Sequence, residues 1–123
     1  MLVFALALAA PTSLTNSHER DIACIVEIAI LADEQKRGVR NTDTFPDVTV
    51  SGKRWTGLMG AQIVEETGQP REIIAFAMSE AAKARQTRGN AVADLNACIL
   101  QMNSQLATAD AVIAPLPKPV KAQ

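Results

Sequence analysis

Apolar residues recur at helical spacing along most of the chain, and the strict alternation typical of strands is nearly absent. This periodicity predicts helices over residues 16–37, 51–67, 70–88 and 90–107. The sequence therefore predicts an all-α fold, a small four-helix bundle-like domain over residues 16–107. The last helix has the cleanest amphipathic pattern, in which the apolar positions are Val92, Leu95, Ile99, Met102 and Leu106.

Local signals mark where these helices begin and end. Asn16 and Glu19 stand three positions apart, like a capping box at the start of the first helix. Asn90 is a favourable N-cap residue for the fourth helix. Each of the first three helices is followed by a glycine, the residue that most often ends a helix: Gly38, Gly68 and Gly89.

The third helix and the segment before the second are less regular. Turn-forming residues and a proline between residues 39 and 52 predict a long loop, with a short extended piece at 48–50. Loops of this length are often functional or mobile. The apolar stripe predicted for the third helix is Ile73, Phe76, Ala77, Ala81 and Ala84.

The first helix is apolar on nearly every side, and Glu27 is the exception between Ile22 and Ala32. Arg20, Glu27 and Glu34 are spaced by seven, so they fall on one narrow stripe of a helix. Isolated buried carboxylates are costly and rare. We therefore expect a solvated edge at Glu27; the alternative, a general acid with a raised pKa, would need a second titrating group beside it.

The two ends of the chain differ in composition from the predicted helical domain. Residues 1–10, MLVFALALAA, form an apolar run ending in an A-x-A pattern, which predicts a secretory signal segment. We therefore expect a periplasmic or secreted location, and a cytoplasmic location is the alternative. Neither this run nor any other is long enough to predict a transmembrane span. Residues 108–123 form a proline-rich tail, predicted to be flexible.

Cys24 and Cys98 are the two cysteines. In an exported chain an even pair favours a disulfide, here between the first and last helices. The alternative is two buried thiols that never meet. His18 is the single histidine, so no zinc site or other cofactor is predicted, and we expect His18 to lie on the surface.

Charge and aromatic content narrow the range of partners. The net charge is −1, with 12 basic and 13 acidic residues spread along the chain, so nucleic acid is not an expected partner. Lys53, Arg54 and Trp55 follow the long loop and are the candidate binding residues, because a tryptophan ring can anchor a ligand or a cation. The alternative is that Trp55 belongs to the core and both cations are solvated.

No motif of a known family or catalytic constellation is present in the sequence. We therefore predict a non-enzymatic, exported protein of the cell envelope that binds another protein or has a structural role; its oligomeric state is not predicted. An enzyme is the least favoured alternative, because Glu27, His18 and the pair Glu65–Glu66 share no motif. A carrier of a small apolar ligand or lipid is the other, with a lining of Ile28, Leu58, Met59, Met78 and Met102.

Overall fold

The structure is a computed structural model that describes residues 14–39 and 41–113. The predicted signal segment and the part of the tail after residue 113 lie outside these residues. The described chain is all-helical, without strands, so the predicted fold class is confirmed. Its helices are α1 (Asn16–Arg37), α2 (Ser51–Thr67), α3 (Arg71–Arg88) and α4 (Leu95–Ile113). None of these combines the length and the hydropathy that crossing a membrane requires.

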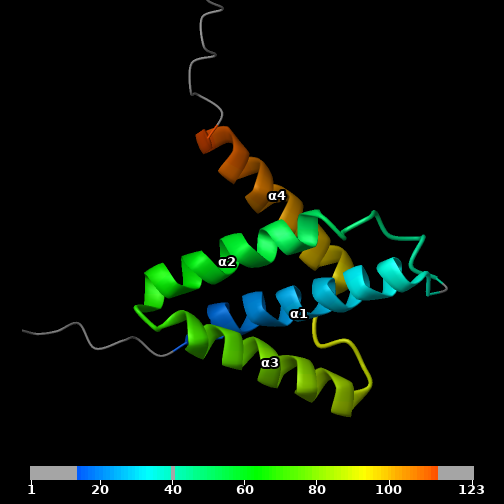
Figure 1. Cartoon of the computed structure of the whole chain (residues 1–123), viewed down its shortest axis with the longest axis horizontal. Helices are drawn as coiled ribbons and strands as arrows, with labels where there is room; N and C mark the ends of the chain where they lie inside the picture. The colour runs from blue at the N-terminus through cyan, green and yellow to red at the C-terminus, as the bar shows by residue number, and fades with distance from the viewer. Residues whose placement is uncertain (1–13, 40, 114–123) are drawn as a thin grey trace, which may run out of the picture.

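α1 and α2 form a central antiparallel pair (Figure 1). α3 and α4 each pack against both members of this pair, but they do not contact each other. α1 therefore has neighbours on two sides, and its apolar residues divide accordingly. Cys24, Ile25, Ile28 and Leu31 join a cluster with α2 and α4. Ile22 and Val26 join a second cluster with Ile63 of α2 and Ile74 of α3.

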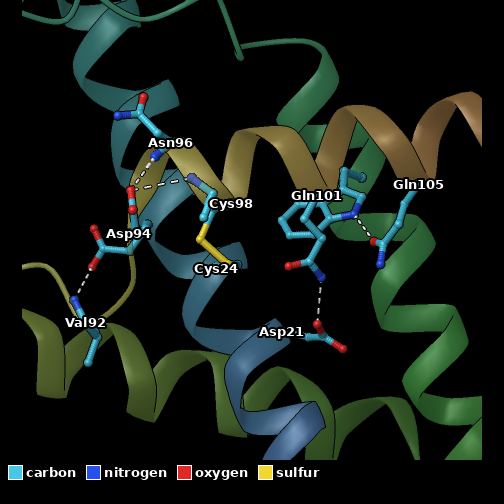
Figure 2. Close-up of a disulfide and its surroundings, with 11 residues drawn as sticks. Asp21, Cys24, Val92, Asp94, Asn96, Cys98, Gln101 and Gln105 are labelled. Carbon is cyan, nitrogen blue, oxygen red and sulfur yellow. Dashed lines mark hydrogen bonds between the residues drawn. A yellow bond between two sulfur atoms is a disulfide. The ribbon is translucent and has the colours of Figure 1, made fainter.

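The disulfide predicted between the first and last helices is present. Cys24 of α1 and Cys98 of α4 are 74 positions apart in sequence, and their Cα atoms lie 5.2 Å apart (Figure 2). One turn along α4, the Gln101 amide donates a hydrogen bond of 2.8 Å to the Asp21 carboxylate on α1. α4 is thus fastened to α1 by a covalent bond and a neighbouring polar contact.

Two predicted N-caps are wrong. α1 is capped by Thr15, whose hydroxyl accepts the His18 N–H at 3.3 Å, and the reciprocal partner in the capping box is the His18 ring. α4 begins only at Leu95, where the Asp94 carboxylate accepts the Asn96 N–H at 3.0 Å (Figure 2). Aspartate at this position also suits the positive end of the helix dipole. Residues 90–94 consequently form a linker, not the first turn of α4.

The helix ends were predicted more accurately than the starts. α1, α2 and α3 end where the glycines Gly38, Gly68 and Gly89 follow them, as expected. Gly38 has a φ of 70° and its N–H returns to the Gln35 carbonyl, a conformation that suits a residue without a Cβ. α4 continues past residue 107 to Ile113, because the alanine-rich sequence there favours a helix although its apolar pattern has faded.

The predicted stripe of α3 is wrong in part. Ile74 is its buried residue, whereas Ile73 is 44% exposed and Phe76 is 62% exposed. Ala77, Met78, Ala81 and Ala82 pack against the same cluster as Ile74. Adjacent isoleucines are compatible with two registers, and the contacts with α1 and α2 select the one that buries Ile74.

The segment between α1 and α2 is a loop, as predicted, but the expected extended piece at 48–50 is not a strand: Thr49 and Val50 turn directly into α2. Gln35 fastens this loop to the end of α1. Its amide donates to the Pro46 carbonyl at 2.9 Å, and its oxygen accepts the Val48 N–H at 2.9 Å. Val48 itself is 1% exposed and belongs to the core cluster that α1 forms with α2 and α4. The loop is therefore anchored at its second half.

Candidate functional site

The candidate binding residues of the sequence do not share a surface. The Trp55 side chain is fully buried in the core, where its indole N–H donates to the Gln105 side chain of α4 at 2.7 Å. Lys53 and Arg54 are exposed on α2, and the Arg54 guanidinium pairs with the Asp110 carboxylate of α4. The core position of Trp55, which was the alternative from the sequence, is confirmed. Its ring cannot stack on a ligand at the surface.

Glu27 is buried, contrary to the expected solvated edge. Its side chain is 3% exposed, and its Oε1 atom accepts two hydrogen bonds of 3.1 Å, from Arg85 Nε of α3 and from the Val92 N–H. The stripe predicted for Arg20, Glu27 and Glu34 is real, but the linker between α3 and α4 crosses it at Glu27. The carboxylate therefore joins α1 to α3 and to this linker.

His18 is also buried, contrary to the expected surface position. Its Nε2 lies 2.8 Å from Glu66 Oε2 of α2, and its Nδ1 accepts the Thr15 N–H at 3.1 Å. Hydrogen bonds from Gln62 and from His18 lower the pKa of Glu66 below its usual value. Because Nδ1 accepts a backbone N–H, the neutral ring carries its proton on Nε2 and donates it to Glu66.

The Thr15 hydroxyl lies 3.1 Å from the same Nδ1 atom, so hydroxyl, imidazole and carboxylate stand in the order of a hydrolytic triad. A triad histidine needs a free lone pair to take the proton of the hydroxyl. Here the single lone pair of Nδ1 already accepts the Thr15 N–H. The arrangement accordingly caps α1 and joins it to α2, and this geometry provides no general base.

A concave, largely apolar surface lies where α1, α2 and α3 meet. Its main part, between α1 and α3, is a groove of about 480 Å³ that is open to solvent. Smaller hollows of about 310 Å³ between α1 and α2 and about 280 Å³ between α2 and α3 adjoin it, and Thr56 borders all three. We call these three hollows together the three-helix groove. Its floor includes Ile25, Val26, Ala29, Ile30, Met78 and Ala82.

The rim of the three-helix groove is mainly basic. Asp33 is the acidic residue that lines it, and this carboxylate pairs with Arg37 at 2.9 Å. Arg85, which also lines the groove, is paired with Glu27. Lys36, Lys53 and Arg71 line the groove as well, and none of the three forms an ion pair with another residue of the described chain.

Two residues of this groove were predicted from the sequence, each for another site: Lys53 beside Trp55, and Met78 in the lining of an apolar-ligand carrier. The rest of the floor was missed, because Ala29 and Ala82 look like ordinary helix-forming residues until three helices are brought together. The available signal was Gly57 and Gly60, which are unusual in the interior of a helix and line the groove between α2 and α3.

A larger hollow of about 640 Å³ lies along the loop after α1, but its lining is mostly polar and includes Asp43 and Asp47. Hydrogen bonds from Thr49 lower the pKa of Asp47. Within residues 14–39 and 41–113, no three His, Cys, Asp or Glu side chains converge in a way that could hold a metal ion.

The chain matches no protein-family model, no curated protein and no solved structure.

Proposed function

We propose that this chain is a non-enzymatic, exported protein of the cell envelope that binds another protein. The observation that carries the proposal is the three-helix groove, an open concave surface whose apolar floor leaves Ala29 exposed and Ile30, Met78 and Ala82 half-buried. Open apolar grooves are common docking sites for a partner helix or an apolar ligand. α4 covers the opposite side of the α1–α2 pair and does not reach α3.

The disulfide supports the proposed periplasmic or secreted location. Disulfides form and persist in oxidising environments such as the periplasm or the extracellular medium, and they are rare in the cytosol. The Cys24–Cys98 bond and the apolar run at residues 1–10 both favour a periplasmic or secreted protein. A cytoplasmic protein with a hydrophobic N-terminal segment is the alternative.

Photo-crosslinking in the native host tests the binding function. A photoreactive phenylalanine analogue replaces Ser79, which is exposed at the edge of the groove, or Ala84, which is exposed on α3 outside it. A partner bound in the groove should give a protein crosslink from position 79 and not from position 84. If neither position crosslinks to a protein, the binding function loses its support.

A carrier of small apolar ligands is the second candidate. The groove between α1 and α3 has a volume within the usual range of ligand sites, about 300–1,000 Å³, and Met78 lies in its floor. Of the lining expected from the sequence, however, Ile28, Met59 and Met102 are core residues. Native mass spectrometry distinguishes this function, because a carrier purified gently from its host should retain a lipid-sized ligand.

A further inference from the structure

Gly57 has no role in the internal packing of the described chain. An added Cβ at this position would meet no atom within 4 Å, so the neighbouring helices do not require a glycine there. Glycine in the interior of a helix costs about 0.5–1 kcal/mol relative to alanine. Gly57 borders the three-helix groove, next to Gly60 and Ala61. A surface of this kind lets the backbone of a bound segment approach α2 closely.

The cations of the groove without ion pairs lie toward both of its ends. Lys36 is in the last turn of α1 and Lys53 in the first turn of α2, and these two helix ends lie together in the antiparallel pair (Figure 1). Arg71 begins α3 at the opposite end of the molecule (Figure 1). A single anionic headgroup would meet one of these ends only. A long ligand with several carboxylates along its length would meet both.

We propose that the three-helix groove binds one amphipathic helix of a partner protein, with its apolar face on the groove floor and Asp or Glu residues on its flanks. This inference rests on the proposed protein-binding function and specifies the chemistry of the partner. Helices bound in this way present apolar residues at helical spacing to an open hydrophobic groove. Carboxylates on the flanks of the helix pair with Lys36, Lys53 and Arg71.

Synthetic peptides of about 18 residues, or five helical turns, test this chemistry on the disulfide-bonded protein. The first peptide has Leu and Ala on one face and Glu on both flanks. The second has Lys in place of every Glu, and the third is a scrambled version of the first. We expect the acidic peptide to bind at least about tenfold more tightly than the other two at low salt, and more weakly as salt is added.

Variants of the protein locate the site. Ala29→Gln places a longer polar side chain over the groove floor and should abolish binding of the acidic peptide. Ala84→Gln, on the exposed outer part of α3, is the matched control and should leave binding unchanged. The double variant Lys36→Glu/Lys53→Glu should lose affinity for the acidic peptide and gain affinity for the basic one. Circular dichroism confirms that each variant is folded.

Gly57→Ala provides a further readout that a purely structural role would not change. The added methyl group removes the helix-interior glycine, so the thermal midpoint should rise. The same methyl group enters the groove, so affinity for the acidic peptide should fall although the protein is more stable. A rise in both quantities would contradict the close approach of a bound backbone.

Several outcomes would overturn the inference. Equal affinity for the acidic and basic peptides would show that charge does not select the ligand. Loss of binding in Phe76→Ser but not in Ala29→Gln would place the site on the outer face of α3. Binding of anionic lipid vesicles in preference to the acidic peptide would indicate a membrane surface. If position 79 crosslinks to a protein in cells while the acidic peptide shows no preference, the proposed function stands and this inference fails.

Discussion

Glu27 connects three parts of the molecule through one oxygen atom. Oε1 accepts the Arg85 side chain of α3 and the Val92 N–H of the linker, and the carboxylate itself lies on α1. Burying a carboxylate is costly unless it is paired and hydrogen-bonded, and both conditions are met here. Arg85 remains 25% exposed, so the pair is only partly desolvated. Within the linker between α3 and α4, Val92 is 43% exposed, so this hydrogen bond and the packing of Ala93 against the core hold the linker in place.

Replacing Glu27 with alanine should lower the free energy of unfolding by about 2–3 kcal/mol, because Arg85 and the Val92 N–H lose their acceptor. Glu27→Gln should cost less, since the amide oxygen can still accept the Val92 N–H. Glu34→Ala, one heptad further along the same stripe, is the matched control and should stay within about 0.5 kcal/mol of the parent. Urea denaturation measures all three. Equal losses for Glu27→Ala and Glu34→Ala would refute the connecting role.

The Asp110 carboxyl makes a pH-dependent contribution to the stability of the protein, and its sign follows from the direction of its pKa shift. A hydrogen bond from Arg54 lowers the pKa of the Asp110 carboxyl in the folded protein. A carboxyl with a lowered folded pKa stabilises the protein above its unfolded pKa of about 4, and this stabilisation is lost as the pH falls through the folded value. The effect is small, because both side chains are about half exposed, at 50% and 55%.

Asp110→Asn should therefore lower stability at pH 6, and its effect should shrink as the pH falls from about 4 toward 2. Denaturation midpoints of the parent and the variant, measured between these pH values, should converge as the pH falls. Midpoints that differ by a constant amount at every pH would mean that the substituted amide disrupts packing and that the ion pair contributes nothing.

At the scale of elements, α2 shows how the same residue type has two different roles in one helix. Gly52 is buried against α1, and an added Cβ would lie 2.9 Å from the Cγ2 atom of Ile28. Ile28 is fully buried and has little freedom to move away. Gly57, one and a half turns later, faces open space. α1 and α2 thus need a glycine at one of the two positions only.

Gly52→Ala should destabilise the protein by up to about 2 kcal/mol, because overpacking costs about 1–3 kcal/mol and the gain in helix propensity offsets about 1 kcal/mol of it. Gly57→Ala should stabilise it by about 0.5–1 kcal/mol. The two thermal midpoints should shift in opposite directions by several degrees. A rise for both variants would show that α1 and α2 can separate slightly at Gly52 without cost.

The elements that local chemistry determines were predictable from the sequence. The glycines after α1, α2 and α3 mark the helix ends correctly, and the cysteine pair gives the disulfide. The start of α4 was misplaced because Asn90 and Asp94 are both good N-cap residues and only tertiary contacts decide between them. Burial of Glu27 and His18 was missed for a similar reason, since their partners Arg85 and Glu66 are distant in sequence.

The candidate site was the least predictable part. Lys53 was identified as a binding residue and does lie on the groove rim, but Trp55, the most distinctive residue nearby, fills the core. A groove floor made of ordinary helix residues has no signature in the sequence, because it exists only where α1, α2 and α3 meet. The charge of the rim likewise depends on which cations find partners in the fold.

At the scale of the whole molecule, α1 and α2 are the helices that α4 packs against, and it does not contact α3. Ile99, Met102 and Leu106 bury its apolar face, and the disulfide adds a covalent link. Closing a loop of 74 residues contributes about 4 kcal/mol in the chain-entropy model. A small domain has about 5–15 kcal/mol in total, so the bond is a large fraction of the stability.

The double variant Cys24→Ala/Cys98→Ala should lower the free energy of unfolding by about 2–5 kcal/mol. Reduction of the parent protein should give a similar loss, which separates the effect of the bond from that of the substitutions. Urea denaturation under oxidising and reducing conditions provides the comparison. A reduced parent with unchanged stability would mean that the packing of α4 suffices without the bond.

Because the disulfide contributes a large part of the stability, the compartment in which the protein folds strongly affects how stable it is. The intact mass of the protein purified from its native host, measured before and after reduction, tests both export and the disulfide. Export through a signal segment should leave a mass that lacks the first nine or ten residues and that rises by two hydrogens on reduction. A full-length chain that is already reduced would contradict export and the disulfide in the cell. The proposed partner would then have to be sought in the cytoplasm, and α4 would have to be held by its noncovalent contacts alone.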